Sequence, residues 1–66
     1  MGIMAQLTQR EREVVSLLMQ GKRRGEIAAE MCVQRGTEKA YLRRARDKAG
    51  ARTTVELVAK VAGEGE

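Results

Sequence analysis

The chain has 66 residues, of which 13 are basic and nine are acidic, so its formal net charge is +4. It contains one cysteine, one aromatic residue (Tyr41), and neither proline nor histidine. A chain of this length forms at most one domain with a small core. The composition argues against a sheet fold and against a rich catalytic pocket, and a single cysteine that cannot form an internal disulfide fits a reducing cytosol.

Positive charge is concentrated in the middle of the chain. Ten basic and four acidic residues lie between Lys22 and Arg52, while the remainder carries three basic and five acidic residues. This polarity predicts an anionic partner for the middle segment. No apolar run approaches the roughly 20 residues that span a bilayer, and the opening MGIMAQ lacks the pattern of a secretory signal. We therefore expect a cytoplasmic protein without a membrane partner.

The first expected helix covers residues 9–20. Thr8 and Glu11 have the spacing of a capping box, in which each side chain accepts a hydrogen bond from the other residue's backbone N–H. Gly21 is expected to end the helix. Residues 1–6 form a short lead-in, whose Ile3 and Met4 are expected to cover one end of the core. The apolar side consists of Val14, Val15, Leu17 and Leu18.

A second helix is expected over residues 24–31, with Ile27, Ala28 and Met31 packed on the first helix. Its start has no Ser, Thr, Asp or Asn cap. Lys22, Arg23 and Arg24 cluster at this N-terminus, where the helix dipole favours an anion, so a phosphate contact is a better explanation than a solvated cluster. Cys32 is expected to be a small buried hydrophobe, because no second metal ligand clusters with it.

The third expected helix, over residues 35–49, organises the chain because it is basic on one side. A period of 3.6 residues places Lys39, Ala40, Arg43 and Asp47 on the outer side. The opposite, packed side carries Tyr41, Leu42, Ala45 and Ala49. Gly50 provides the left-handed end of the helix.

A fourth helix is expected over residues 54–62, after a second capping box formed by Thr53 and Glu56. Its apolar residues are Val55, Leu57, Val58 and Val61, and GEGE is expected to be a frayed acidic tail. Two helices joined by about three residues, the second basic on its outer face, indicate a helix-turn-helix. We therefore predict an all-α fold: a four-helix, bundle-like helix-turn-helix forming a single domain over residues 1–66.

From Leu7 to about Ala62 the sequence resembles the helix-turn-helix domain of the LuxR/GerE family of bacterial transcription regulators. The resemblance rests on LTQREREVVSLLMQG, EIAAEM, TEKAYLRRARDKAG and VELV. It implies sequence-specific binding of double-stranded DNA, with the third helix in the major groove, by a bacterial or phage-encoded regulator. It also implies a homodimer formed through the fourth helix. Separately, we expect RNA polymerase as a further partner, and no cofactor or metal.

Carried over position by position, the resemblance assigns roles to individual residues. Base contacts are implied for Lys39, Ala40 and Arg43. Phosphate contacts are implied for Arg23, Arg24, Arg35, Thr37 and Arg46. Dimerisation is predicted for Val55, Val58 and Val61 on a different ground: with Leu57, they give the fourth helix more apolar side chains than a small, alanine-rich core can bury.

The chain also departs from the family pattern. Arg23 and Gln34 replace capping serines, Glu38 replaces a valine, and Tyr41 replaces a common histidine. Small alanines stand where the family has large aliphatic residues, at Ala45, Ala49 and Ala51. A buried leucine-to-alanine change costs about 2–5 kcal/mol when the site cannot collapse, so we expect closer helices, filling by Tyr41 and the methionines, or a covering partner.

Two classes of function therefore remain after the sequence is considered. The first is a DNA-binding transcription regulator. The second is a protein-interaction module on the same scaffold that binds RNA polymerase or another regulator, and Glu38, Asp47 and the missing capping serines motivate it. No catalytic constellation can be named, so we do not expect an enzyme.

Overall fold

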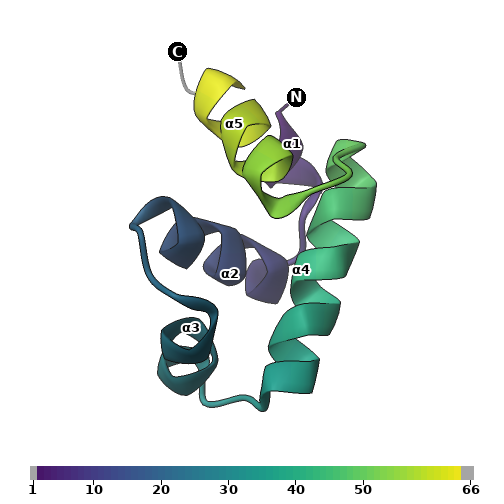
Figure 1. Cartoon of the computed structure of the whole chain (residues 1–66). Helices are drawn as coiled ribbons and strands as arrows, with labels where there is room; N and C mark the ends of the chain where they lie inside the picture. Colours follow the sequence, from purple (N-terminus) through teal and green to yellow (C-terminus); the bar gives the residue numbers. More distant parts are fainter. Residues whose placement is uncertain (1, 65–66) are drawn as a thin grey trace.

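The computed structural model describes residues 2–64, and this part of the chain forms five helices and no strand (Figure 1). They are α1 (Ile3–Gln6), α2 (Gln9–Met19), α3 (Arg24–Met31), α4 (Arg35–Ala49) and α5 (Thr54–Glu64). The all-α expectation is confirmed. The four longer helices begin and end within two residues of the expected ranges. The short α1 is additional, since the sequence indicated only a lead-in there.

Helix α4 is the central element of the fold because it packs against each of the other four helices. In Figure 1, α1 and α5 lie at one end of α4, α3 lies at the other end, and α2 crosses between them. The core takes Val14 and Val15 from α2, Ile27 from α3, Leu42 from α4 and Leu57 from α5. The expected packed side of α4 is therefore the side that faces the core.

Small residues of α4 and the following turn also reach this core, where larger side chains surround them. Ala45 is fully buried and Ala51 is nearly so. Met31 belongs to the core cluster, while Met4 and Tyr41 are partly buried against it. Tyr41, Met4 and Met31 therefore belong to or pack against the core that contains Ala45 and Ala51, whereas Met19 is exposed.

Helix α2 starts with the expected capping box. The hydroxyl of Thr8 accepts the Glu11 N–H at 3.3 Å, and the Glu11 carboxylate accepts the Thr8 N–H at 3.0 Å. These contacts satisfy two of the backbone donors that a helix start leaves free. At the other end of α2, Gly21 has a φ of 85°, a left-handed conformation that glycine adopts without a steric penalty.

Helix α5 begins with a variant of the second capping box and extends further than expected. The Thr53 hydroxyl accepts the Glu56 N–H at 3.1 Å, but the Glu56 carboxylate accepts the N–H of Arg52, at 3.2 Å. At its far end, the Glu64 side chain accepts the Ile3 N–H and joins α5 to α1. Gly63 and Glu64 belong to α5, so the first half of the predicted frayed tail is helical. The other half of that tail lies outside the described residues.

The sequence predicted the end of α4 correctly, but it did not predict how α3 ends. Gly50 follows α4 with a φ of 68°, as expected from its position, and the Lys60 ammonium donates to the carbonyls of Ala49 and Gly50. Cys32 follows α3 with a φ of 57° and is exposed. The expectation that Cys32 is a buried hydrophobe was wrong, because the left-handed turn directs this side chain outward rather than along the packed face of α3.

Candidate nucleic-acid interface

Helices α3 and α4 form a helix-turn-helix whose turn consists of Cys32, Val33 and Gln34. Left-handed Cys32 reverses the chain, and the Val33 N–H then donates to the Ala28 carbonyl at 3.0 Å. Val33 is half-buried against the core, so the turn is held by packing as well as by hydrogen bonds. This arrangement presents the outer side of α4 to solvent at one edge of the molecule.

The outer side of α4 carries cations that are free to meet an anion. Lys39, Arg43 and Arg44 are exposed, and we call these three residues the α4 basic face. None of them takes part in an ion pair among residues 2–64. Ala40 lies beside them and is half-buried, and exposed Asp47 likewise has no ion-pair partner within that range. The predicted base-contact residues Lys39, Ala40 and Arg43 thus lie on one helix surface.

The side chains of three predicted phosphate-contact residues form no ion pair with an acidic side chain of residues 2–64. Arg23 is exposed at the N-cap of α3, Thr37 is exposed in the first turn of α4, and Arg46 is half-buried on the flank of α4. The Glu26 carboxylate accepts the Arg23 N–H at 2.9 Å. That contact caps α3 through the backbone and leaves the Arg23 guanidinium available, which compensates for the missing capping serine.

The other two predicted phosphate-contact residues, Arg24 and Arg35, converge on Glu38. The Glu38 side chain is 0% exposed. One carboxylate oxygen lies 2.6 Å from Nε of Arg24, and the other lies 3.6 Å from Nε of Arg35. Each arginine is the first residue of its helix, so this ion-pair cluster joins the start of α3 to the start of α4.

The sequence indicates Glu38 as a departure from a valine and as a reason to consider a protein-interaction module, but it did not lead us to expect that Glu38 is buried. A signal for that burial was present, since Glu38, Leu42, Ala45 and Ala49 follow the helical period that places residues on one face. The polarity of the side chain argued against burial, because carboxylates are rarely buried unless they are paired. Its Arg24 partner lies on another helix, where no local pattern could indicate it.

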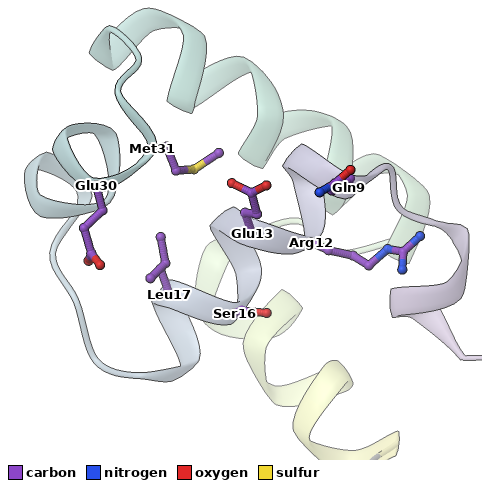
Figure 2. Close-up of a pocket in the computed structure, with 7 residues that line it drawn as sticks. All are labelled: Gln9, Arg12, Glu13, Ser16, Leu17, Glu30 and Met31. Atoms are coloured by element: carbon purple, nitrogen blue, oxygen red, sulfur yellow. The ribbon is translucent and has the colours of Figure 1, made fainter.

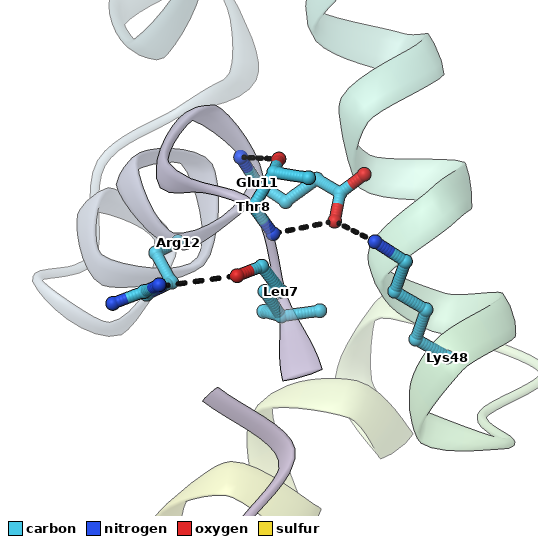
Figure 3. Close-up of polar contacts among 5 residues, drawn as sticks. All are labelled: Leu7, Thr8, Glu11, Arg12 and Lys48. Atoms are coloured by element: carbon cyan, nitrogen blue, oxygen red, sulfur yellow. Dashed lines mark hydrogen bonds and ion pairs between the residues drawn. The ribbon is translucent and has the colours of Figure 1, made fainter. Parts of the chain in front are cut away.

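A second buried carboxylate fixes α4 against α2. Glu11 is 2% exposed, and its carboxylate accepts from the Lys48 ammonium at 2.7 Å as well as from the Thr8 N–H (Figure 3). The Arg12 side chain donates to the Leu7 carbonyl nearby. Burial alone would raise the pKa of Glu11, but the hydrogen bonds from Lys48 and Thr8 and the Lys48 charge outweigh it, so the pKa is lowered.

This lowered pKa predicts acid sensitivity that depends on Glu11. A carboxyl group whose pKa is lower in the folded state stabilises the fold above its unfolded pKa, near 4.3, and the stabilisation disappears as pH falls through the folded value. We expect the free energy of unfolding of the wild type to decrease below about pH 4.3, and Glu11→Gln to show a smaller decrease. Urea unfolding at several pH values between 3 and 7 measures both. Glu13→Gln is the control, because Glu13 lies on the same helix and is only half-buried; if Glu11→Gln retains the same acid dependence as the wild type and this control, Glu11 is not responsible.

An open groove lies between α2 and α3, away from the α4 basic face. It has a volume of about 370 Å³, and Leu17 and Met31 provide its apolar part. Figure 2 shows Glu13 beside these two side chains, on the side toward Arg12, with Arg12 and Glu30 at opposite sides of the groove. Because the rim carries both signs of charge, the groove lacks the electrostatic character of an anion site.

The described residues contain no cluster of three or more His, Cys, Asp or Glu side chains placed to hold a metal ion. Over residues 2–64, no helix combines the length and the apolar character needed to cross a bilayer.

A helix-turn-helix whose second helix presents unpaired cations has the features of a DNA-binding domain. The chain belongs to the luxR family of bacterial regulatory proteins, since the family model (GerE) matches residues 5–61. Membership of this family indicates helix-turn-helix DNA binding and transcription regulation as the general function. No curated protein and no solved structure matches the chain.

Proposed function

We propose that the protein binds specific DNA sequences and regulates transcription, with α4 lying in the major groove. The observation that carries this proposal is the α4 basic face: Lys39, Arg43 and Arg44 are exposed and unpaired among residues 2–64. Elsewhere in the same basic segment, Lys22 pairs with Glu30 and Lys48 pairs with Glu11. The unpaired cations are thus concentrated on the one helix that the turn presents outward.

In this proposal, Arg43 and Lys39 read base edges. Arginine bound by two hydrogen bonds to guanine is the commonest specific contact in the major groove, and lysine reads the same acceptors. The small Ala40 side chain allows close approach and can contact a thymine methyl group. Asp47 lies on the same outer side of α4, where its carboxylate would repel phosphate unless it accepts a hydrogen bond from cytosine.

Contacts to the DNA backbone fix the register of α4 in the groove. We assign them to Arg23 at the start of α3 and to Thr37 and Arg46 on α4, whose side chains engage no carboxylate of residues 2–64. Phosphate contacts supply affinity without carrying sequence information. Arg24 and Arg35, for which the sequence predicts the same role, differ from these residues because Glu38 engages them.

We also propose that the regulator acts in the cytoplasm as a homodimer formed through α5, in contact with RNA polymerase when bound to DNA. Val55 is 79% exposed and Val58 is half-buried, so these two side chains are available for a contact with a second copy. Val61, predicted in the same role, is 6% exposed and belongs to the core of its own chain. We therefore restrict the proposed dimer contact to Val55 and Val58.

Selection of bound sequences from a random duplex pool, followed by substitution of the reading residues, tests the proposal. On the selected site, we expect Arg43→Ala to lose about 1–3 kcal/mol of binding free energy and to relax specificity at one base pair, because a bidentate contact is removed. Lys39→Ala should do the same at a neighbouring base pair. Quantitative gel shifts on single-base variants of the site measure both effects.

Arg12→Ala is a matched control, because it removes one exposed cation from α2 and leaves α4 unchanged. It should preserve the preference for each base of the selected site. If Arg43→Ala and Lys39→Ala also preserve that preference, α4 does not read DNA. That result, or the absence of any salt-dependent binding by the wild type, would favour the alternative function, a module that binds RNA polymerase or another regulator.

A further inference from the structure

We propose that Glu38 is an internal counter-anion, which neutralises arginines at the α3–α4 junction and thereby reduces binding to non-specific DNA. This inference rests on the proposed DNA binding and adds a residue that sets the strength of the sequence-independent part of the DNA affinity. It concerns the Arg24–Glu38–Arg35 cluster, whose members have not been assigned to base reading.

The geometry of the cluster places a negative charge between two arginines. Glu38 is fully buried, with Nε of Arg24 at 2.6 Å from one carboxylate oxygen and Nε of Arg35 at 3.6 Å from the other. Arg35 extends back over the start of α3, where a methyl group added at Gly25 would lie 3.7 Å from Nη1 of Arg35. The two guanidinium groups therefore meet at one place, although they belong to different helices.

The contact of Glu38 is electrostatic rather than a fully satisfied hydrogen-bond network. Its oxygen nearer to Arg35 has no hydrogen-bond partner in the described part of the chain, although it is buried. An incompletely bonded buried carboxylate is costly to retain for stability alone, and a well-packed apolar residue often serves as well. The feature that an apolar side chain could not reproduce is the negative charge, which lies at the first turn of α4 and beside the start of α3.

The location of this charge explains its expected effect on DNA binding. Helix starts expose backbone N–H groups and carry the positive end of the helix dipole, and these features attract phosphate. Arg24 and Arg35 would reinforce that attraction if they were unpaired. Glu38 instead provides the anion from within the chain, so two arginines and one carboxylate present a single net positive charge.

Non-specific binding depends on how many phosphates a protein neutralises, because each one releases condensed counterions. A carboxylate that cancels a cation at the interface therefore weakens binding to every sequence. Base reading by Lys39 and Arg43 does not involve this cluster, since neither residue contacts Glu38 in an ion pair of residues 2–64. The expected result is lower non-specific affinity with the base contacts retained.

The salt dependence of binding to a random-sequence duplex, measured by fluorescence anisotropy, tests this inference. For Glu38→Gln and Glu38→Val we expect tighter binding and a log–log salt slope steeper by about 0.9, because the cluster gains one net positive charge and neutralises one additional phosphate. Glu13→Gln is the matched control: it makes the same charge change on α2, where Glu13 pairs with Arg10, and its slope should equal that of the wild type.

An unchanged or shallower slope in folded Glu38→Gln or Glu38→Val would overturn the inference. The double variant Glu38→Gln/Arg35→Ala provides a second measurement, and the Arg35 side chain is 63% exposed, so the fold should tolerate its removal. The double variant removes one charge of each sign and restores the single net positive charge of the wild-type cluster, so its slope should return to the wild-type value; a slope as steep as that of Glu38→Gln would also overturn the inference. If the wild type binds no duplex at all, the proposed function itself fails, which is a distinguishable result.

Discussion

Arg24→Ala should lower the free energy of unfolding by about 3 kcal/mol, because it leaves Glu38 buried without its closest partner. Removing one member of a buried ion pair costs about 3–5 kcal/mol. We expect the lower end of this range, since the Arg24 side chain is 34% exposed and the Arg35 guanidinium remains 3.6 Å from the carboxylate. For a domain of this size, a loss of that magnitude is a large part of the total stability. Urea unfolding followed by circular dichroism measures it.

The double variant Arg24→Ala/Glu38→Val separates the loss of the ion pair from the loss of arginine packing. Removing the carboxylate as well eliminates the uncompensated buried charge, so we expect most of the lost stability to return. Arg23→Ala is the matched control, because it changes the adjacent exposed arginine and should alter the stability by less than about 0.5 kcal/mol. A double variant that is no more stable than Arg24→Ala would mean that Glu38 carries no penalty when it loses Arg24.

Much of the fold could be predicted because its determinants are local. The period of apolar residues indicates the packed faces of α2 and α4, and the Thr8–Glu11 spacing indicates where α2 begins. Gly50 indicates the end of α4, because a left-handed backbone conformation is required there and glycine adopts that conformation without strain. Each of these sequence features lies within a few residues of the helix face or helix end that it determines.

The features that were missed depend on contacts between distant parts of the chain. Glu38 can be buried because Arg24, on another helix, forms an ion pair with it. Glu64 lies in the last turn of α5, where its carboxylate accepts a hydrogen bond from the Ile3 N–H. Cys32 adopts a left-handed conformation that its residue type does not favour, because the turn between α3 and α4 requires it. In each case the surrounding structure determines the outcome.

In the candidate site, too, the features set by local sequence could be predicted and those set by contacts between helices could not. The helical period was sufficient to place Lys39, Ala40 and Arg43 on one outer surface of α4. It could not distinguish the arginines that remain unpaired, such as Arg23, from those engaged by a carboxylate, such as Arg24. The DNA contacts of both kinds of arginine remain predictions. Measurements of the salt dependence of binding distinguish the unpaired arginines from the paired ones.

The proposed dimer predicts that Val55→Glu should reduce affinity for a two-half-site operator by about 10²–10⁴-fold, because the second half-site is then no longer bound intramolecularly. Val55 is the most informative position, since its 79% exposure means that a charge there should leave the monomer folded. Val58→Glu should have the same effect if Val58 is at the centre of the contact. The two-fold arrangement favours half-sites about 10 bp apart, centre to centre.

Sedimentation with and without the selected duplex shows how many copies bind each site. Gln20→Glu is the control, because it introduces the same charge at an exposed position beyond the end of α2, and it should bind as the wild type does. A folded Val55→Glu protein that binds one copy per site supports the contact, whereas two copies with unchanged affinity would exclude Val55 from it. If Val58→Glu unfolds while Val55→Glu still binds as two copies, both results assign α5 to the core of its own chain, where Leu57 and Val61 already lie.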